Sequence, residues 1–483
     1  MLRIESDKWR EECGVFGIYA QKDKADVKNG GCDVAMSTYW GLYALQHRGQ
    51  ESAGMSLSDG VHMDVFRGMG LLREVFQNGM PTMPAHIAIG HVRYSTTGSS
   101  MLRNTQPLLV KYAGGQISLA HNGNLTNARE IRKNLESKGY VFQTSIDSEV
   151  IVNLIARSSC DTIEEKIIDS LRDVEGAYCL TIMTENKLIG VRDPHGFRPL
   201  CVGKTSTGEW VVASESCALD AVEAAHVRDV EPGEMVIIDE NGPVYRKFGE
   251  ACRRSVCVFE YIYFARADSV IDGQSVYEAR FSMGRTLARE SRFKADLVIS
   301  VPDSGTAAAL GYSYESGIPY AEGLLKNRYI GRTFIQPEQK NRSSSVRIKL
   351  NAIASIVKGK SVIMVDDSIV RGTTSGKIVR LLKEAGAKEV HMCVSSPPIC
   401  YPCFYGIDTS VRKELIAASK TVDEIRQVIG ADSLHYLSIE GLRNSIPQLS
   451  GETLCNACFD SDYPAPVPCE EAEDGNKFVF EVR

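Results

Sequence analysis

The sequence predicts a mixed α/β protein of two domains, the second of which is built on a parallel sheet. Its 483 residues exceed what one hydrophobic core usually holds. Residues 361–365 are apolar enough for a strand buried on both faces, and residues 375–385 have the spacing of a helix. Residues 295–312 repeat this order of strand, loop and helix. Strands that alternate with helices in this way are typical of a parallel sheet.

Composition and charge narrow the class of protein. The chain is 43% hydrophobic and 24% charged, with a net charge of −6, so nothing in its charge favours nucleic acid or an anionic membrane as a partner. No apolar run reaches the length of a membrane span, and the charged start lacks the apolar core of a signal peptide. We therefore expect a cytoplasmic protein. Its 14 cysteines are not expected to form a disulfide framework there, which leaves structural thiols, catalysis or a metal centre.

Cys13 stands at a candidate cleavage junction. It opens the apolar run CGVFGIYA after twelve mostly polar or charged residues. Removal of residues 1–12 would place a thiol and a free α-amine on the same residue, and an amine with a pKa of about 8 can act as general base for that thiol. A lone cysteine in a strand is more often a small core residue, and a charged N-terminus is often only frayed. The interpretation of Cys13 therefore depends on the motifs that follow.

Three of these motifs carry side chains suited to binding an amino acid and cleaving an amide. Residues 90–98 (GHVRYSTTG) place Arg93 after a strand-like run, where it could bind a carboxylate. Residues 118–127 (SLAHNGNLTN) predict a strand, a tight turn at Asn122-Gly123 and the start of a helix. The Asn122 amide and the Gly123 N–H are suitable donors for a developing oxyanion. Asp147, in TSIDSEV, could bind an α-amine.

Taken together, CGVFG, HRGQESAG, HVRYSTTG, HNGNLTN and DSE resemble the glutaminase domain of N-terminal-nucleophile amidotransferases. The resemblance covers about residues 13–240 and implies an αββα sandwich of antiparallel sheets. It implies that a terminal cysteine attacks the side-chain amide of glutamine and forms a glutamyl thioester. The implied roles are nucleophile for Cys13, oxyanion hole for Asn122 and Gly123, glutamine binding for Arg93 and Asp147, and support of the pocket for Arg48.

The junction between the domains is expected between about residues 240 and 260. Residues 233–249 read as strands joined by a hairpin turn at Asn241-Gly242, and residues 256–269 (VCVFEYIYFARADS) read as an aromatic core strand. VRDPHGFRPL, upstream, reads as a structural turn between strands. The expected division is a propeptide at 1–12, a glutaminase domain at 13–245, a second domain at 246–463 and a tail at 464–483.

The stretch SVIMVDDSIVRGTTSG, residues 361–376, predicts a site for a phosphorylated sugar that carries Mg²⁺. Two acids follow the buried strand at the sheet edge where open α/β folds bind ligands, and hydroxyls and a glycine then lead into a helix N-terminus. An ordinary capped turn is the alternative. The stretch resembles the ribose-phosphate motif of type I phosphoribosyltransferases, which bind phosphoribosyl pyrophosphate (PRPP). The resemblance implies that the acids Asp366 and Asp367 bind Mg²⁺ and the ribose. It implies that the loop binds the 5′-phosphate through Ser368, Arg371, Gly372, Thr373 and Thr374.

Two further segments resemble PRPP-binding parts of the same family. Asp303, Ser304 and Gly305 resemble its pyrophosphate loop, with Ser304 joining the Mg²⁺ shell, although small residues after a strand also allow close helix packing. Residues 326–350 are polar and basic, as in a solvated loop. In the family such a loop closes over PRPP and excludes water. Lys326 and Arg332 are the predicted contacts there, and spacing does not rank them against Arg328, Arg347 and Lys349.

The cysteines of the second half predict a metal centre. Cys455 and Cys458 form a C-x-x-C pair that suits redox chemistry or zinc, and two more thiolates would suit a [4Fe–4S] cluster. Spacing does not separate zinc from iron–sulfur, and Cys393 and Cys400 compete with Cys403. CVFEYIYFARADS, PPICYPCFYGIDT and CNACF resemble the cluster-bearing segments of the iron–sulfur class of glutamine PRPP amidotransferases. That resemblance selects Cys257, Cys403, Cys455 and Cys458.

The combined resemblance implies an enzyme of the pentosyltransferase class that opens purine biosynthesis. Glutamine would be hydrolysed at Cys13, and the ammonia would attack C1 of PRPP to give 5-phosphoribosylamine, pyrophosphate and glutamate. Mg²⁺ and a [4Fe–4S] cluster are the implied cofactors, with purine nucleotides as feedback inhibitors and a homotetramer or homodimer as the assembly. The rivals are an asparagine- or glucosamine-forming amidotransferase, a salvage phosphoribosyltransferase and a PRPP sensor without turnover. DDSIVRGTT argues against the first, the glutaminase half against the second, and Cys13 with its oxyanion donors against the third.

Overall fold

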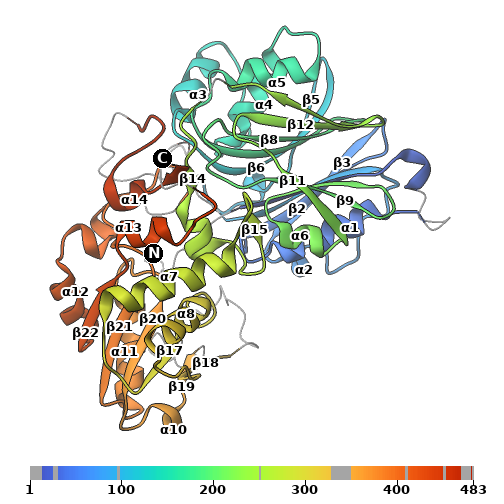
Figure 1. Cartoon of the computed structure of the whole chain (residues 1–483). Coiled ribbons are helices and arrows are strands. Elements are labelled where there is room, and N and C mark those ends of the chain that lie inside the picture. Colours follow the sequence, from blue (N-terminus) through green and yellow to red (C-terminus); the bar gives the residue numbers. More distant parts are fainter. Residues whose placement is uncertain are drawn as a thin grey trace.

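The computed structural model describes residues 13–25, 31–94, 98–249, 252–327, 350–407, 412–449, 453–468 and 480. Figure 1 shows two lobes, one formed by the first half of the chain (blue to green) and one by the second half (yellow to red). The predicted propeptide at residues 1–12 lies outside the described residues, as do Arg328, Arg332, Arg347, Lys349 and most of the tail.

Two antiparallel sheets form the first lobe. One has seven strands in the order β11 (Ala224–Asp229), β9 (Cys201–Thr205), β10 (Trp210–Ala213), β1 (Gly14–Tyr19), β4 (Ile87–Arg93), β2 (Ser52–Ser58) and β3 (Met63–Met69). The other has six strands in the order β13 (Gly242–Lys247), β12 (Glu234–Asp239), β8 (Leu188–Arg192), β7 (Gly176–Met183), β6 (Gly115–Leu125) and β5 (Leu108–Tyr112).

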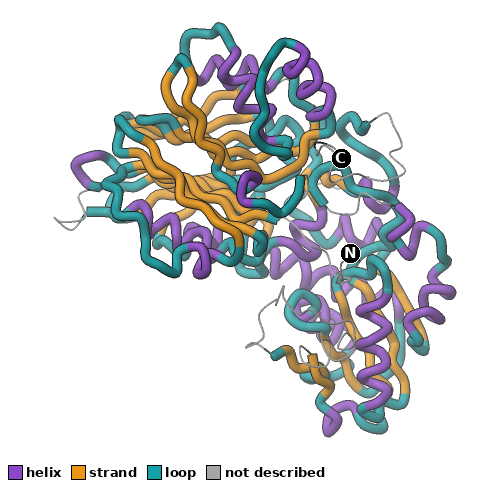
Figure 2. Tube along the Cα trace, turned by 180° about the vertical axis from the view of Figure 1, so that it is seen from behind, coloured by secondary structure: helices purple, strands orange, loops and turns teal. Residues whose placement is uncertain are grey.

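Helices cover the outer face of each sheet, so the expected αββα sandwich is confirmed (Figures 1 and 2). The seven-stranded sheet packs on α1 (Val34–Ala44), α2 (Leu72–Val75) and α6 (Ser216–Asp220). The six-stranded sheet packs on α3 (Ala128–Ser137), α4 (Ser148–Arg157) and α5 (Ile163–Leu171). Between the sheets lies an apolar core that includes Val15, Ile89, Ala120, Leu188 and Val236. Central strands such as β1 are therefore buried along their whole length, because they have a core on both faces.

The turn predicted at Asn122-Gly123 is wrong. Strand β6 runs through both residues to Leu125, and Gly123 stands opposite Tyr178 of β7. Gly123 has a φ of +146°, and an added Cβ would lie 2.1 Å from the carbonyl oxygen of Ala177. The glycine is needed because a neighbouring backbone approaches closely, and strand pairing overrides the local turn signal. The hairpin predicted near Asn241-Gly242 is confirmed, because Asp239 of β12 pairs with Gly242 of β13.

A parallel sheet with helices on both faces forms the second lobe, as predicted. Its strands are β17 (Leu297–Ser300), β20 (Ser361–Asp366), β21 (Glu389–Val394) and β22 (Ser433–Tyr436). One face packs on α7 (Val276–Ser291) and α8 (Thr306–Ser316), and the other on α11 (Thr373–Glu384) and α12 (Val422–Ile429).

Short elements complete the second lobe and the described turns. The strands are β14 (Val256–Cys257), β15 (Val270–Ile271), β16 (Gln274–Ser275), β18 (Leu324–Lys326), β19 (Leu350–Ala352) and β23 (Leu454–Cys455). The helices are α10 (Ala354–Val357), α13 (Ile439–Asn444) and α14 (Ala457–Asp460), and 3₁₀ turns lie at Lys22–Lys24, Leu102–Asn104, Arg412–Glu414 and Ile416–Ala418.

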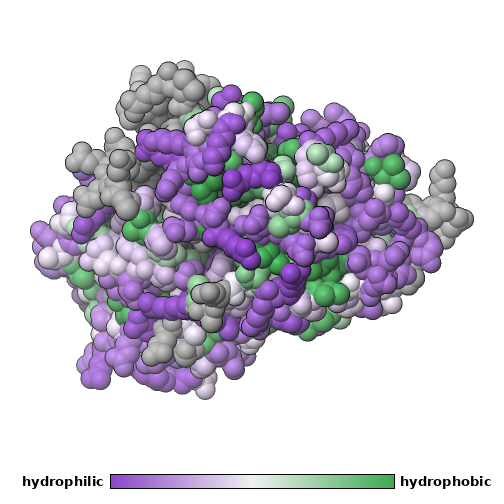
Figure 3. Space-filling view, turned by 90° about the horizontal axis from the view of Figure 1, so that it is seen from above, coloured by the Kyte–Doolittle hydropathy of each residue, from purple (hydrophilic) through white to green (hydrophobic). Residues whose placement is uncertain are grey.

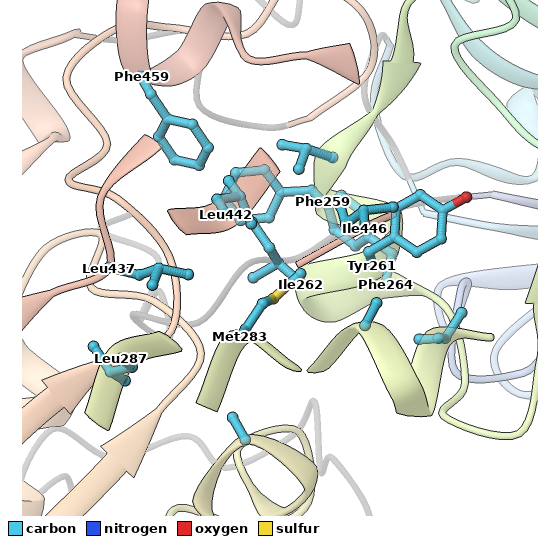
Figure 4. Close-up of a cluster of buried hydrophobic side chains, with 14 of the residues drawn as sticks. Phe259, Tyr261, Ile262, Phe264, Met283, Leu287, Leu437, Leu442, Ile446 and Phe459 are labelled. Carbon is cyan, nitrogen blue, oxygen red and sulfur yellow. The ribbon is translucent and has the colours of Figure 1, made fainter. Parts of the chain in front are cut away.

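The aromatic run after residue 255 is not the predicted core strand. Only Val256–Cys257 is a strand, and a π-helical turn, Glu260–Phe264, follows it. The aromatic side chains do lie in the core, where Phe259, Tyr261 and Phe264 gather near Met283 of α7 (Figure 4). Arg280 of α7 donates to the carbonyl oxygens of Tyr261 (2.8 Å) and Ala265 (2.7 Å), which satisfies backbone groups that a strand would have paired within a sheet.

The surface is mostly hydrophilic in the view from above, with scattered hydrophobic residues (Figure 3). Across the described parts of the chain, every helix is too short or too polar to cross a membrane.

Candidate functional sites: two sheet edges and a cysteine pocket

Cys13 lies buried immediately before β1, beside the end of β4. Gly14 pairs with Val92, and the Cys13 thiol donates to the carbonyl oxygen of Tyr94 at 3.4 Å. An added Cβ on Gly14 would lie 2.9 Å from a methyl group of Val92, so packing explains the glycine that follows the cysteine. The position of Cys13 is thus set by the pairing of two central strands.

Arg93 ends β4 on the same side of the molecule and is buried. Burial lowers the pKa of Arg93, while the charges of Cys13, Glu51 and Asp147 oppose that change. The guanidinium is therefore within electrostatic reach of two other residues predicted for this site. The fold brings Cys13, Arg93 and Asp147 together from three separate segments.

Asn122 and Gly123 lie on β6 in the facing sheet. The Asn122 side chain is 1% exposed, and its Nδ2 has no hydrogen-bond partner in the described part of the chain. A buried amide without a partner costs about 1–3 kcal/mol, so such a group is a candidate for ligand binding. The N–H groups of His121 and Leu125 donate away from β7, to Gln106 Oε1 (2.8 Å) and Asp147 Oδ2 (3.0 Å). Strand alternation directs the Gly123 N–H to that same edge.

Asp147 caps helix α4. One of its carboxylate oxygens accepts from the N–H of Ser148 (2.9 Å) and the other from the N–H of Leu125 (3.0 Å). The residue therefore ties the start of α4 to the end of β6. Its predicted contact with a substrate α-amine stays a prediction.

Arg48 lies beneath the nucleophile strand, where an added Cβ on Gly14 would lie 3.4 Å from Arg48 Cδ. It is ion-paired with Glu215 and, at 2.6 Å, with Glu260 of the second lobe. Burial alone would lower the pKa of Arg48, but the two carboxylates raise it. The predicted role of Arg48 in supporting the pocket stays a prediction. Sequence reasoning missed both glutamates, because both act through an arginine that lies far from them in the chain.

The second site lies at the carboxyl edge of the parallel sheet. Asp366 ends β20, and Asp366 and Asp367 are each 1% exposed. Asp367 accepts from the hydroxyl of Ser368 (2.6 Å) and from that of Ser304, so the two predicted loops meet at this acid. An added Cβ on Gly305 would lie 2.7 Å from the carbonyl oxygen of Val365. Close packing therefore does explain Gly305, as the alternative interpretation expected.

Two helix N-termini flank these acids. Helix α8 starts at Thr306, directly after the loop that holds Asp303 and Ser304. Helix α11 starts at Thr373 and includes Thr374, after Gly372 with a φ of +80°. An anion is stabilised at such ends by the helix dipole and the backbone N–H groups. The edge thus combines two anion positions with a pair of carboxylates.

Charged side chains surround this edge. Lys326 is paired with Asp303 (2.5 Å), and Arg371 with Glu414. Arg280 is a further residue that sequence reasoning missed, because an arginine in an amphipathic helix usually faces solvent. Arg280 is buried, and burial lowers its pKa to about 10, although the negative charge of Asp367 acts to raise the pKa.

Cys257, Cys403, Cys455 and Cys458 line one pocket, together with Arg198 and Tyr405. Strands β14 and β23 are parallel and place Cys257 opposite Cys455. The competing cysteines lie elsewhere: Cys393 is inside β21, and Cys400 donates to the carbonyl oxygen of Ala417 at 3.5 Å. Among the residues that the structure describes, no three His, Cys, Asp or Glu side chains are placed to hold a single metal ion. The four thiols instead form the wall of a shared pocket.

Burial raises the pKa of the thiols that line this pocket. Burial raises the pKa of Cys257 to about 11, Arg198 lowers it, and Cys403 raises it. Burial and the neighbouring thiols also raise the pKa of Cys455 and of Cys458. Four thiols that line one pocket, three of them buried, are a suitable set of ligands for a soft metal centre.

Comparisons with known proteins match both lobes. Residues 91–221 match a family described as glutamine amidotransferase domain, and residues 279–401 match one described as phosphoribosyl transferase domain. The chain is 51% identical over 462 residues to an amidophosphoribosyltransferase of Bacillus subtilis, covering 95% of each sequence. It is 50% identical to one of Archaeoglobus fulgidus, covering 95% of this chain and 100% of the relative.

A solved structure agrees with these matches. It is a glutamine PRPP amidotransferase from B. subtilis complexed with ADP and GMP. The TM-score is 0.88 at 50% identity, over 95% of this chain and 98% of the other.

Proposed function

This chain belongs to the amidophosphoribosyltransferase family, and from that premise we propose how its two sites divide the reaction. The enzyme takes nitrogen from glutamine and transfers it to C1 of PRPP, which gives 5-phosphoribosylamine, pyrophosphate and glutamate, the first committed step of purine biosynthesis. The observation that carries the proposal is the meeting of Cys13, Arg93 and Asp147 in one lobe, together with two buried acids between two helix N-termini in the other.

In the first lobe, Cys13 is the nucleophile. Once residues 1–12 are removed, its own α-amine takes the thiol proton, and the sulfur forms a bond to the amide carbon of glutamine. The Asn122 amide and the Gly123 N–H stabilise the oxyanion. The C–N bond then breaks, the α-amine returns the proton to the leaving ammonia, and water hydrolyses the thioester to glutamate. Arg93 binds the carboxylate of glutamine and Asp147 its α-amine.

In the second lobe, Asp366 and Asp367 hold the ribose hydroxyls of PRPP. The loop from Ser368 through Arg371 to Thr374 binds the 5′-phosphate at the N-terminus of α11. Asp303, Ser304 and Gly305 bind the pyrophosphate near the N-terminus of α8. Lys326 and Arg332 are the proposed cationic contacts.

Mg²⁺ fits this edge, because Asp366, Asp367 and Ser304 supply the oxygen ligands that it prefers and phosphoribosyltransferases typically depend on it. When bound, it neutralises charge on the leaving pyrophosphate. The residues of the chain orient C1 toward the arriving ammonia and exclude water that would compete with it.

The pocket formed by Cys257, Cys403, Cys455 and Cys458 is the proposed site of a [4Fe–4S] cluster. The donor set supports this assignment, because three buried thiols and the partly buried thiol of Cys403, from three segments, line one pocket. A bound cluster would cross-link the segments that carry β14 and β23 to the loop after residue 400. We assign it a structural or oxygen-sensing role.

Regulation, assembly and domain limits complete the proposal. The solved relative holds ADP and GMP, which supports purine nucleotides as feedback inhibitors of this chain. We propose a homotetramer or homodimer and a cytoplasmic location. The proposed domains are residues 13–245 and 246–463, between a propeptide at 1–12 and a tail at 464–483.

The test separates the two half-reactions. Cys13→Ala is expected to abolish glutamine-dependent synthesis and to leave synthesis from ammonium salts within about twofold of wild type, because only the nucleophile is removed. Cys201→Ala, a buried cysteine outside both sites, is the matched control and should keep both activities. Loss of both activities in a folded Cys13→Ala protein would contradict the assignment.

The reciprocal variant carries Asp366→Asn and Asp367→Asn. It should lose PRPP turnover with either nitrogen source and retain basal glutamine hydrolysis, which is followed by release of glutamate. Undiminished PRPP turnover would show that these acids do not bind the substrate.

A further inference from the structure

A loop of the second lobe lies against the strand that carries the oxyanion donors. We call residues 403–406 the 403–406 loop. Asn124 of β6 donates from Nδ2 to the carbonyl oxygen of Phe404 at 2.9 Å. An added Cβ on Gly406 would lie 3.3 Å from the carbonyl carbon of Gly123 and 3.4 Å from its Cα. The loop therefore touches the backbone of β6 at Gly123 and the residue that follows it.

The 403–406 loop is itself held firmly. Arg198 donates to the carbonyl oxygen of Tyr405 (3.0 Å), and the Tyr405 ring stacks on Phe197 with ring centres 4.3 Å apart. The Tyr405 hydroxyl donates to the carbonyl oxygen of Ala465 (2.6 Å), and its N–H donates to the sulfur of Cys403 (3.4 Å). The loop thus connects Cys403 of the cysteine pocket to β6.

Strand β7 also restricts the backbone of β6 at Gly123. Gly123 stands opposite Tyr178, and the carbonyl oxygen of Ala177 lies where a side chain on Gly123 would begin. The Gly123 backbone is therefore in contact with both β7 of its own lobe and Gly406 of the other lobe. Two such contacts fix a peptide plane more tightly than strand pairing alone.

Gly406 is suited to this contact for two independent reasons. Its φ of +108° lies in the region that favours glycine, and a Cβ would come within 3.1 Å of Arg198 Nη2 as well as 3.3 Å of Gly123. A side chain at this position would push the loop away from β6 or push β6 toward β7.

We propose that Gly406 and the carbonyl group of Phe404 position the oxyanion hole of the glutaminase site, although both belong to the phosphoribosyltransferase half. The inference rests on the proposed function, because it takes Asn122 and Gly123 as the oxyanion donors. Gly406 acts as a positioning residue and does not touch glutamine. A shift of the donors by a fraction of an ångström weakens stabilisation of the transition state more than binding of the substrate.

The test uses the full-length protein with two variants, each with a matched control. Gly406→Ala is compared with Gly79→Ala, whose φ of +111° is similar but whose added Cβ meets nothing within 4 Å. Asn124→Ala is compared with Asn127→Ala, which loses an exposed bond of the same kind, to the carbonyl oxygen of Asp173. The measurements are kcat and KM for glutamine, synthesis from ammonium salts, and the rate of Cys13 alkylation by iodoacetamide mapped by mass spectrometry.

Both test variants should lose on the order of tenfold to a hundredfold in glutamine-dependent kcat, with little change in KM. Ammonia-dependent synthesis and Cys13 alkylation should stay within about twofold of wild type, because neither needs the oxyanion donors. Both controls should behave as wild type. Asn124→Ala carries the test if Gly406→Ala does not fold, because it removes the amide that donates to Phe404 and leaves the backbone of Gly406 unchanged.

The result that overturns the inference is a test variant whose glutamine kcat equals that of its control, or whose kcat falls in parallel with ammonia-dependent synthesis. Failure of the proposed function would look different. In that case Cys13→Ala would still use glutamine, whatever the variants of the 403–406 loop do.

Discussion

One buried histidine near Cys13 stays uncharged in the folded protein. His91 of β4 is fully buried and donates from Nε2 to the carbonyl oxygen of His121 (3.0 Å), directly before Asn122. Burial lowers the pKa of His91 to about 3. The imidazole therefore stays neutral in the folded protein at a pH where an unfolded histidine is charged.

This histidine predicts a loss of stability in mild acid. Between pH 6.5 and about 3 the unfolded chain binds a proton at residue 91 and the folded chain does not, so the free energy of unfolding falls as the pH falls. One such group changes the free energy of unfolding by about 1.4 kcal/mol per pH unit. Urea unfolding at pH 7, 6 and 5 should show a shallower pH dependence for His91→Gln than for wild type. The exposed His62→Gln is the control, and equal slopes for all three proteins would contradict the prediction.

At the same scale, sequence reasoning proposes residues that belong to motifs and misses those whose role depends on tertiary partners. Cys13, Arg93 and Asn122 stand in short patterns whose chemistry can be argued locally. Glu215 stands in no such pattern, and the pattern that contains Glu260 was interpreted through its cysteine. The importance of both glutamates comes from Arg48, which lies far from both in the chain. An isolated glutamate in a sequence is usually a solvated residue, and only the fold shows that these two are buried.

Among the elements, the π-helical turn Glu260–Phe264 contributes buried ion pairs between the lobes. Glu260 pairs with Arg48 (2.6 Å) and Arg198 (3.4 Å) of the first lobe, and Arg280 holds the carbonyl oxygens at the end of the turn. The sequence predicted burial of this segment correctly but not its helical form. Aromatic and β-branched residues favour strands only where a partner strand exists, and here the partner is two residues long.

Glu260→Gln tests the charge of this turn without opening a cavity. Loss of one carboxylate from a buried network is expected to lower the free energy of unfolding by about 3 kcal/mol, because both arginines lose a buried counter-charge. Glu315→Gln, which removes a carboxylate paired with Arg285 and Arg289 on the surface, should leave the unfolding midpoint nearly unchanged. Calorimetry measures the unfolding midpoints of both variants. Equal midpoints would mean that the buried network of Glu260 does not stabilise the protein.

In the molecule as a whole, the two lobes are joined by buried ion pairs as well as by the chain. Arg192 of the first lobe is paired with Asp272 of the second (2.7 Å), in addition to the contacts of Glu260. The parallel sheet of the second lobe could be predicted from periodicity, which is a local property, whereas the αββα sandwich of the first lobe was expected from the resemblance of its motifs to a known family. The way in which the lobes meet could not, because it depends on side chains that have no shared pattern in the sequence.

The cysteine pocket predicts the metal content of the whole protein. After anaerobic purification we expect about four iron and about four sulfide per chain. Cys403→Ser should lower both, whereas Cys400→Ser should not, because Cys400 lies three positions away and outside the pocket. Stoichiometric zinc in the wild-type protein would overturn the assignment of the cluster.

The central claim is that Cys13 becomes reactive only as the first residue of the mature chain. N-terminal mass analysis of purified, active protein tests this most directly. We expect a chain that begins at Cys13, with residues 1–12 removed. A chain that still begins at Met1 and hydrolyses glutamine at the full rate would contradict the account.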